Sequence, residues 1–236
     1  MGPISRRSFV GQATAGLAAL STLGSTANAQ FVYTTSSWKM AEFDKLLKHP
    51  ARVKQVYDAT VISGGKFLNN IKNSLNGLHF GYGIPASQIK IISAMHGPAN
   101  MLSYDDHIWQ KYRIGEWLKV IDPKTGQPTV RNLYYPSAAG DPPKYASQDP
   151  NDESSLYQDT SMQALQSRGV QFLCCHTATE EQVRALVRLY KFPQKPEEIV
   201  QEMQAHTVPG IQINPSMVSA IALLQSEGHY TYITVV

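Results

Sequence analysis

The chain has 236 residues, of which 42% are hydrophobic, and a formal net charge of +3. This length and apolar content suffice for one domain with a substantial hydrophobic core. The small net charge gives no basis for a nucleic acid or an anionic membrane as a partner. The two cysteines, Cys174 and Cys175, are neighbours, which excludes the disulfide framework typical of small secreted proteins.

The first residues have the order of a removable export signal. Arg6 and Arg7 precede a short stretch rich in small apolar residues, and Ala27-Asn28-Ala29 is typical of a cleavage site. The stretch is too short to span a bilayer, and the paired arginines indicate the twin-arginine route. We expect cleavage after residues 1–29 and a single periplasmic or secreted domain over 30–236, without a stable membrane anchor. A disordered basic tail or an uncleaved anchor is the alternative. Loss of the two arginines lowers the formal charge from +3 to +1.

The next part of the chain alternates helical and extended patterns. Apolar spacing predicts a short amphipathic helix over 38–48, and alternation of polar with β-branched or aromatic residues predicts a strand over 52–58. A helix with one apolar face opens at 63–65. The apolar run 89–95 is typical of a strand buried on both faces, and a helix is expected around 104–120.

A long polar segment interrupts this alternation. Residues 122–152 are rich in proline and aspartate and lack a periodic pattern, so we expect about 104–154 to form a surface insertion. Ser155 with Gln158 has the spacing of a capping box for a helix that ends at Gly169.

The remainder resumes the alternation. A strand is expected over 170–175, followed by a helix that Thr177 and Glu180 cap and that ends at Phe192-Pro193. A short strand over 210–213 precedes Asn214-Pro215, which is typical of a helix start. The last helix leads to a strand over 230–235. Strands that alternate with helices predict a mostly parallel sheet in a three-layer α/β/α domain.

Ligands of such sheets bind beyond the carboxyl ends of the strands. This rule selects the residues that end the predicted strands or follow them: Asp58, His96, Gly97, Cys174, Cys175, His176 and Asn214.

Cys175 is the most reactive group in this set. It lies just before a predicted helix start, where unpaired N–H groups and the helix dipole favour a thiolate. The adjacent His176 can supply a positive charge or take up a proton. The alternative is structural: Cys174, and with it Cys175, is a small core residue, while His96 and Asp58 are turn formers.

Other chemistries find little support. The spacings of a covalent haem site, a Cys-x-x-Cys zinc or dithiol site, a phosphate loop and a nucleophile elbow are absent from the sequence. Metal binding by Cys175, His176 and His96 is an alternative, but we expect neither a metal nor a cofactor. The remaining histidines share no metal-like spacing and are expected at the surface or in packing: His49, His79, His107, His206 and His229.

Several loose motifs together resemble the DsrE/DsrF-like family of sulfur-handling proteins. They are the strand before His96-Gly97, the segment 165–175 that runs through Gly-Val into the cysteines, and the segments 213–218 and 224–230. The resemblance implies a five-stranded parallel sheet, homo-oligomers such as trimers or hexamers, and a cysteine that carries sulfur as a persulfide. Cys175 matches that cysteine best by position, and Cys174 is the alternative.

The chain departs from the small cytoplasmic members of that family. It has an export signal, an extra N-terminal helix and the long insertion, which place the partners of a cytoplasmic relay in another compartment.

The resulting hypothesis is an exported DsrE-like protein that binds or transfers a small sulfur species. Cys175 would carry the sulfur and His176 and His96 would tune its ionisation. The expected ligand-binding residues are Asp58, Gly97, Asn214 and Cys174. A non-catalytic module for ligand binding or assembly, with structural cysteines, is the first alternative, and a metal-dependent or redox enzyme is the second.

Overall fold

The computed structural model describes residues 38–136 and 144–235. The expected export signal at 1–29 therefore lies outside the described residues.

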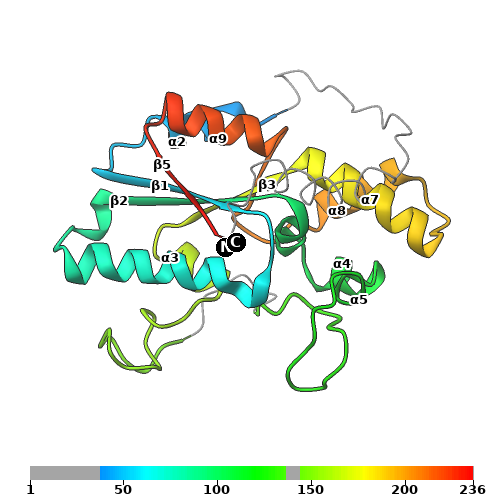
Figure 1. The fold of residues 1–236 in the computed structure, drawn as a ribbon, viewed down its shortest axis with the longest axis horizontal. Coiled ribbons are helices and arrows are strands. Elements are labelled where there is room, and N and C mark those ends of the chain that lie inside the picture. Colours follow the sequence, from blue (N-terminus) through cyan, green and yellow to red (C-terminus); the bar gives the residue numbers. More distant parts are fainter. Residues whose placement is uncertain (1–37, 137–143, 236) are drawn as a thin grey trace, which may run out of the picture. The chain divides into compact units, whose positions relative to one another are not determined.

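The described residues form a five-stranded, all-parallel sheet with the strand order β4-β3-β2-β1-β5 (Figure 1). The predicted α/β class is thereby confirmed, and so is the strand number. The strands are β1 (Val53–Ala59), β2 (Ile89–Met95), β3 (Gln171–Cys175), β4 (Gln212–Asn214) and β5 (Thr231–Thr234).

Helices cover both faces of the sheet, which confirms the three-layer arrangement. Figure 1 shows α2 and α9 together on one face and α3 on the other, while α7 and α8 pack against each other beyond β3. The helices are α2 (Met40–Leu47), α3 (Lys66–Asn76), α4 (Asp106–Lys111), α5 (Ile114–Trp117), α6 (Met162–Ser167), α7 (His176–Tyr190), α8 (Pro196–Ala205) and α9 (Met217–Ser226).

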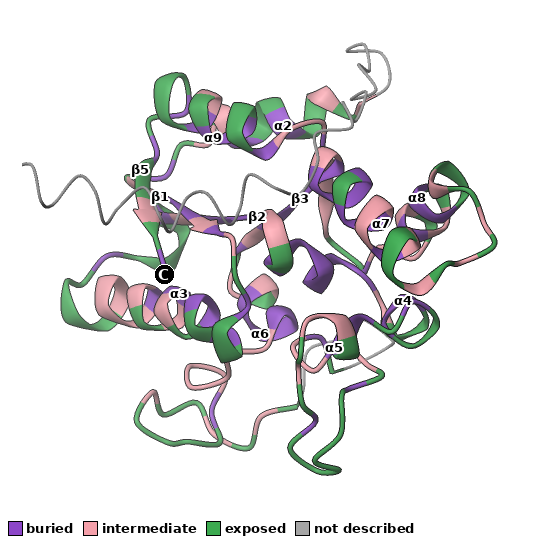
Figure 2. Ribbon diagram, turned by 45° about the vertical axis from the view of Figure 1, so that its right-hand side comes forward, coloured by how far each residue is buried: buried purple, intermediate pink, exposed green. Residues whose placement is uncertain are grey.

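Strand alternation divides the hydrophobic core into two parts. Tyr57 and Met95 belong to the part on the α3 side, whereas Val56 and Ala94 face α2 and α9. Because both faces are buried, β2 is apolar along nearly its whole length, as its sequence indicates. In Figure 2 the buried residues line the strands and the inner sides of the helices.

The connection from β4 to β5 reverses the direction in which the sheet grows. The chain places β2 beside β1, β3 beside β2 and β4 beside β3, then crosses back to place β5 on the other side of β1. When all crossovers are right-handed, helices that connect strands in opposite directions along the sheet lie on opposite faces of it. Accordingly, Leu186 of α7 joins the α3-side core and Leu224 of α9 joins the other. The ends of β3 and β4 thus form the topological switch point, where such sheets bind ligands.

Two predicted helices differ from the structure. The expected single helix at 104–120 is two short helices, α4 and α5, because Arg113 between them has a left-handed backbone with φ of 54°. The expected capping box at Ser155 is also wrong. Helix α6 begins later, and its cap is Ser161, whose hydroxyl accepts the Ala164 N–H at 3.2 Å.

Two further differences concern the last third of the chain. Helix α8 was not predicted, because the sequence analysis assigned no element between Pro193 and Gly210. Asn214 is the last residue of β4 rather than a helix cap, and α9 begins at Met217 after Ser216.

Candidate functional site

The carboxyl ends of four strands bring predicted residues side by side. Pairing aligns Met95 with Cys174 and Cys175 with Asn214. Met95 and Cys174 face the α3 side, so the residues that follow them, His96 and Cys175, are directed toward the α9 side. We call Asp58, His96, Cys175 and Asn214, together with Tyr232 of β5, the rim row.

Asp58 joins two members of the rim row. Its Oδ1 lies 2.5 Å from His96 Nε2, and its Oδ2 accepts the Tyr232 hydroxyl at 2.5 Å. The hydrogen bond to Asp58 raises the pKa of Tyr232, so the phenol is a neutral donor at neutral pH. Asp58 thus orients the His96 ring through its contact with Nε2. Tyr232 was not predicted, because nothing in the sequence places β5 beside β1.

Gly97 shapes the turn after β2. Its φ is 54°, and a Cβ at this position would lie 2.8 Å from the backbone oxygen of Thr60. Its own carbonyl accepts a hydrogen bond from Gln182 Nε2. These features give Gly97 a structural role in holding His96 at the rim.

The sulfur of Cys175 lies between two helix starts. It accepts the N–H of Ala178 in the first turn of α7 at 3.4 Å and the N–H of Met217 at the start of α9 at 3.3 Å. The predicted cap of α7 at Thr177 is therefore wrong: the cap is Cys175 itself, and the Thr177 hydroxyl donates to the Pro215 carbonyl at 2.8 Å.

Burial controls the ionisation of this thiol. Cys175 is only 5% exposed, and burial raises its pKa although the N–H groups of Ala178 and Met217 act in the opposite direction. The resting group is consequently a neutral thiol near pH 7. Any thiolate formed at this position has two backbone donors already in place.

Asn100 holds the backbone of Cys175 in position. Its Oδ1 accepts the Cys175 N–H at 2.8 Å, and its Nδ2 donates to the Cys175 carbonyl at 3.2 Å. Asn100 is fully buried, in the 3₁₀ helix Gly97–Ser103. Sequence reasoning missed it because a polar residue within an apolar turn carries no spacing signal.

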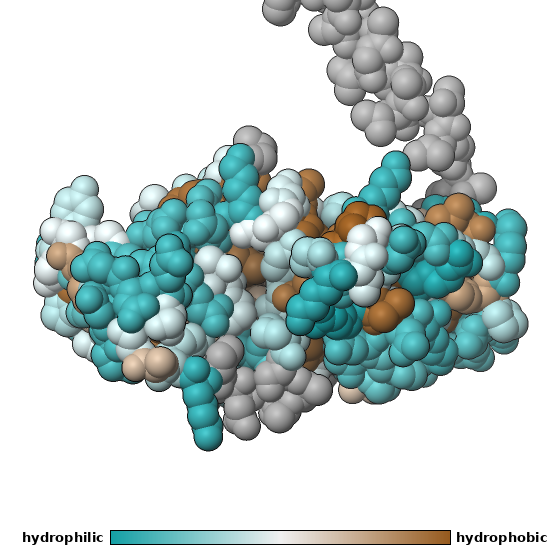
Figure 3. All heavy atoms as spheres, turned by 90° about the horizontal axis from the view of Figure 1, so that it is seen from below, coloured by the Kyte–Doolittle hydropathy of each residue, from teal (hydrophilic) through white to brown (hydrophobic). Residues whose placement is uncertain are grey.

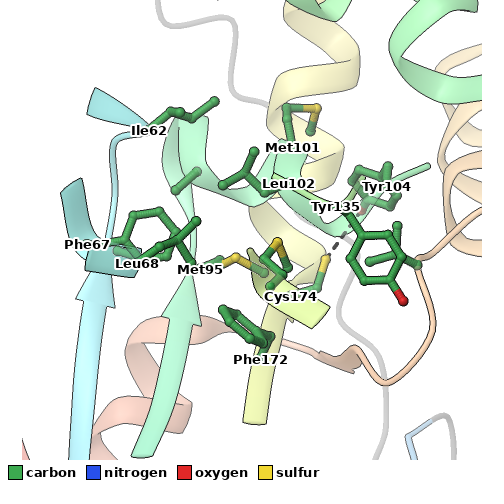
Figure 4. Packing of buried hydrophobic residues seen from close by; sticks show 14 of the residues in the cluster. Ile62, Phe67, Leu68, Met95, Met101, Leu102, Tyr104, Tyr135, Phe172 and Cys174 are labelled. Atoms are coloured by element: carbon green, nitrogen blue, oxygen red, sulfur yellow. Dashed lines mark hydrogen bonds between the residues drawn. The ribbon is translucent and has the colours of Figure 1, made fainter. Parts of the chain in front are cut away.

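Cys174 points the other way, into the α3-side core. In Figure 4 it lies among Met95, Phe172 and Tyr104, and its sulfur is 3.4 Å from the Tyr104 hydroxyl. It is fully buried, which raises its pKa, and both cysteines are free thiols. This environment fits the alternative that Cys174 is a core residue.

His176 and Asn214 use their side chains in local contacts. His176 Nδ1 lies 2.7 Å from Gln204 Nε2, and its ring meets Trp38 edge-on with 5.2 Å between centroids. Burial lowers its pKa, against the attraction of Glu180, whose Oε1 lies 3.3 Å from Nε2. None of these contacts involves Cys175. Asn214 is buried and donates to the Gln212 carbonyl at 3.3 Å.

A hollow of about 610 Å³ opens beyond the ends of β1 and β2. This volume is within the range of small-molecule sites. Its lining consists of Val61, Ile62, Ser63, Gly64, Pro98, Trp117, Leu118, Lys119, Val120, Ile121 and Tyr134.

Figure 3 shows the molecule from the α3 side, where hydrophobic residues form small separate patches on a mainly hydrophilic surface.

The fold and the rim row define a class: a three-layer α/β/α protein with an all-parallel sheet and a thiol at its topological switch point. No family model, no curated protein and no solved structure matches the chain. Among the helices of residues 38–136 and 144–235, none has the length and apolar character that crossing a bilayer requires.

Proposed function

We propose that this protein is an exported DsrE-like carrier that binds or transfers a small sulfur species through Cys175. The observation that supports this proposal is the position of the Cys175 sulfur, which accepts N–H groups from the first turns of α7 and α9 at the switch point. Backbone donors of this kind stabilise an anionic sulfur.

The transfer step is a thiol–persulfide exchange. The Cys175 thiolate attacks the outer sulfur of a donor persulfide, R–S–SH, forming a new S–S bond while the S–S bond of the donor breaks. The donor leaves as the thiolate R–S⁻, and Cys175 becomes a persulfide with no net oxidation. The reverse sequence delivers the sulfur to an acceptor thiolate.

His96 is the base of this proposal. It neighbours Cys175 along the rim, since Met95 and Cys174 are paired, and Asp58 holds its Nε2. In this proposal the His96 ring takes up the thiol proton when Cys175 ionises, and Asp58 stabilises the imidazolium that forms. We assign this step to His96 rather than to His176, whose ring contacts Gln204 and Trp38.

Intact mass after incubation with a polysulfide or persulfide donor tests the proposal. We expect the wild type and Cys174→Ala to gain the mass of one sulfur atom, and Cys175→Ala to gain none. Cys174→Ala is a matched control, because it removes a neighbouring buried thiol and leaves the rim intact. No gain in the wild type, or an equal gain in Cys175→Ala, refutes the carrier.

The second candidate is a non-catalytic module that binds a small ligand. Two observations favour it: both sulfurs are buried, and the hollow of about 610 Å³ lies at the same edge of the sheet. Alkylation near neutral pH separates the two functions. A carrier thiol reacts in the native protein, whereas two structural thiols react only after denaturation.

Export and assembly complete the proposal. Cleavage after residue 29 predicts a periplasmic protein whose N-terminal sequence begins at Gln30. Sedimentation equilibrium of that product should give a trimer or hexamer. An uncleaved N-terminus would contradict the export assignment, and a monomer would contradict the assembly.

A further inference from the structure

Three side chains that are distant in the sequence meet where α4 lies against the end of α8. His107 belongs to α4, Glu202 to α8, and His206 follows α8 as its C-cap. One ligand atom of each lies within 4.8 Å of those of the other two. We propose that His107, Glu202 and His206 bind a zinc ion, or a divalent transition ion of similar preference, independently of the Cys175 site.

The donor set fits this class of metal. Two imidazole nitrogens and one carboxylate oxygen are a ligand set of catalytic zinc, with water in the fourth position. The two rings are stacked with 4.2 Å between centroids, and His107 Nε2 lies 2.7 Å from Glu202 Oε1. Zinc–nitrogen bonds of about 2.0 Å separate tetrahedral donors by about 3.3 Å, so the donors, which lie within 4.8 Å of one another, reach this spacing when the side chains shift and the stacked rings tilt.

Metal-binding histidines usually form a hydrogen bond through the ring nitrogen that does not bind the metal, and Asp105 supplies such a contact to His206. Its Oδ2 lies 2.8 Å from His206 Nδ1, which holds the ring and leaves Nε2 as the ligand atom. The two segments are also joined through the backbone, since the Asp105 N–H donates to the His206 carbonyl at 3.0 Å. The carboxyl end of α8 carries partial negative charge, which favours a cation at His206.

Lys111 is the competitor for the carboxylate. Its ammonium lies 2.5 Å from Glu202 Oε1 and 2.7 Å from Oε2, and Tyr112 also donates to Oε2 at 2.7 Å. The Lys111 side chain is 37% exposed, so it can turn into solvent when an ion arrives. Without a metal, the same contacts make Glu202 a hydrogen-bonded link between α4 and α8, which is the outcome to be distinguished.

The access route lies beside His107. A hollow of about 270 Å³ is lined by Asp105, Asp106, His107, Tyr135, Thr207, Val208 and Pro209. A water or small ligand in the fourth coordination position can therefore exchange with solvent on this side.

Titration of the tag-free, chelator-treated protein with Zn²⁺ tests the site. We expect one Zn²⁺ per chain by calorimetry and a rise in the melting temperature with Zn²⁺ concentration. His107→Ala and His206→Ala should weaken binding by at least about tenfold, and Asp105→Asn, which keeps the helix cap, by about tenfold. His229→Asn is the matched control: His229 is exposed with φ of 56°, a conformation that asparagine tolerates, and binding should be unchanged.

Lys111→Met gives a prediction of opposite sign, because removal of the competing ammonium should tighten Zn²⁺ binding by a few fold. Substitution by Co²⁺ should give the visible absorption of a tetrahedral site without a sulfur charge-transfer band. Absent binding, binding unchanged in both histidine variants, or a sulfur band would overturn the proposal and leave only the hydrogen-bonded link. The carrier function does not depend on this result, since its readout is the mass that the protein gains at Cys175.

Discussion

Replacement of Gly97 by alanine should destabilise the domain by about 2 kcal/mol. A left-handed backbone costs a residue with a Cβ about 1–2 kcal/mol. The added Cβ also lies 2.8 Å from the Thr60 carbonyl, a backbone atom that cannot rotate away. Moving that carbonyl weakens its hydrogen bond from Ala99, worth about 1 kcal/mol. The lower entropy of the unfolded alanine chain offsets about 0.4–1 kcal/mol of this loss.

Gly169→Ala separates the clash from the backbone strain. Gly169 has φ of 90°, but nothing lies within 4 Å of a Cβ built there. It should therefore cost only about 1 kcal/mol or less. Urea unfolding measures both variants, with midpoints compared at an unchanged m-value. Equal losses of unfolding free energy in the two variants would refute this reasoning. They would show that the Thr60 carbonyl moves away from the added Cβ without a free-energy cost.

Three further predictions concern Asn100, His176 and Tyr232. Asn100→Ala leaves the buried N–H of Cys175 without its acceptor, so unfolding free energy should fall by about 2–3 kcal/mol and native alkylation of Cys175 should accelerate; unchanged alkylation would contradict this role. Burial lowers the pKa of His176 below its ordinary value of 6.5. The contribution of the neutral ring to the unfolding free energy is therefore fully present above pH 6.5. It declines below that pH, by at most about 1.4 kcal/mol per pH unit. The unfolding free energy of His176→Gln should show a shallower slope between pH 7 and 5. Tyr232→Phe removes one exposed donor to Asp58 and should cost less than about 1 kcal/mol, while slowing sulfur loading; normal loading would exclude the phenol from the site.

The layered fold could be predicted because buried parallel strands have a strong sequence signature. The apolar run at 89–95 matches β2 at both ends, since turn residues bound it. Helix α8 was missed although Pro196 and the glutamates after it are typical of a first helical turn. With that helix unassigned, the i, i+4 spacing of Glu202 and His206 went unrecognised.

Contacts within the site depended on strand order, which the sequence does not contain. The sequence indicates that Asp58, His96 and Cys175 end strands, but only the return of the chain over α9 brings β5 and Tyr232 to Asp58. Because β3 is buried on both faces, it has no polar side from which to tell which cysteine faces which core.

Under the proposed carrier function, the thiol and the persulfide of Cys175 should differ in ionisation. Burial raises the pKa of the thiol, so the empty protein holds it largely neutral. A persulfide is intrinsically more acidic, and its outer sulfur lies about 2.05 Å beyond the first. In the proposed persulfide, the first sulfur keeps the N–H groups of Ala178 and Met217. Under the proposed carrier function, the persulfide form should therefore ionise at lower pH than the empty thiol.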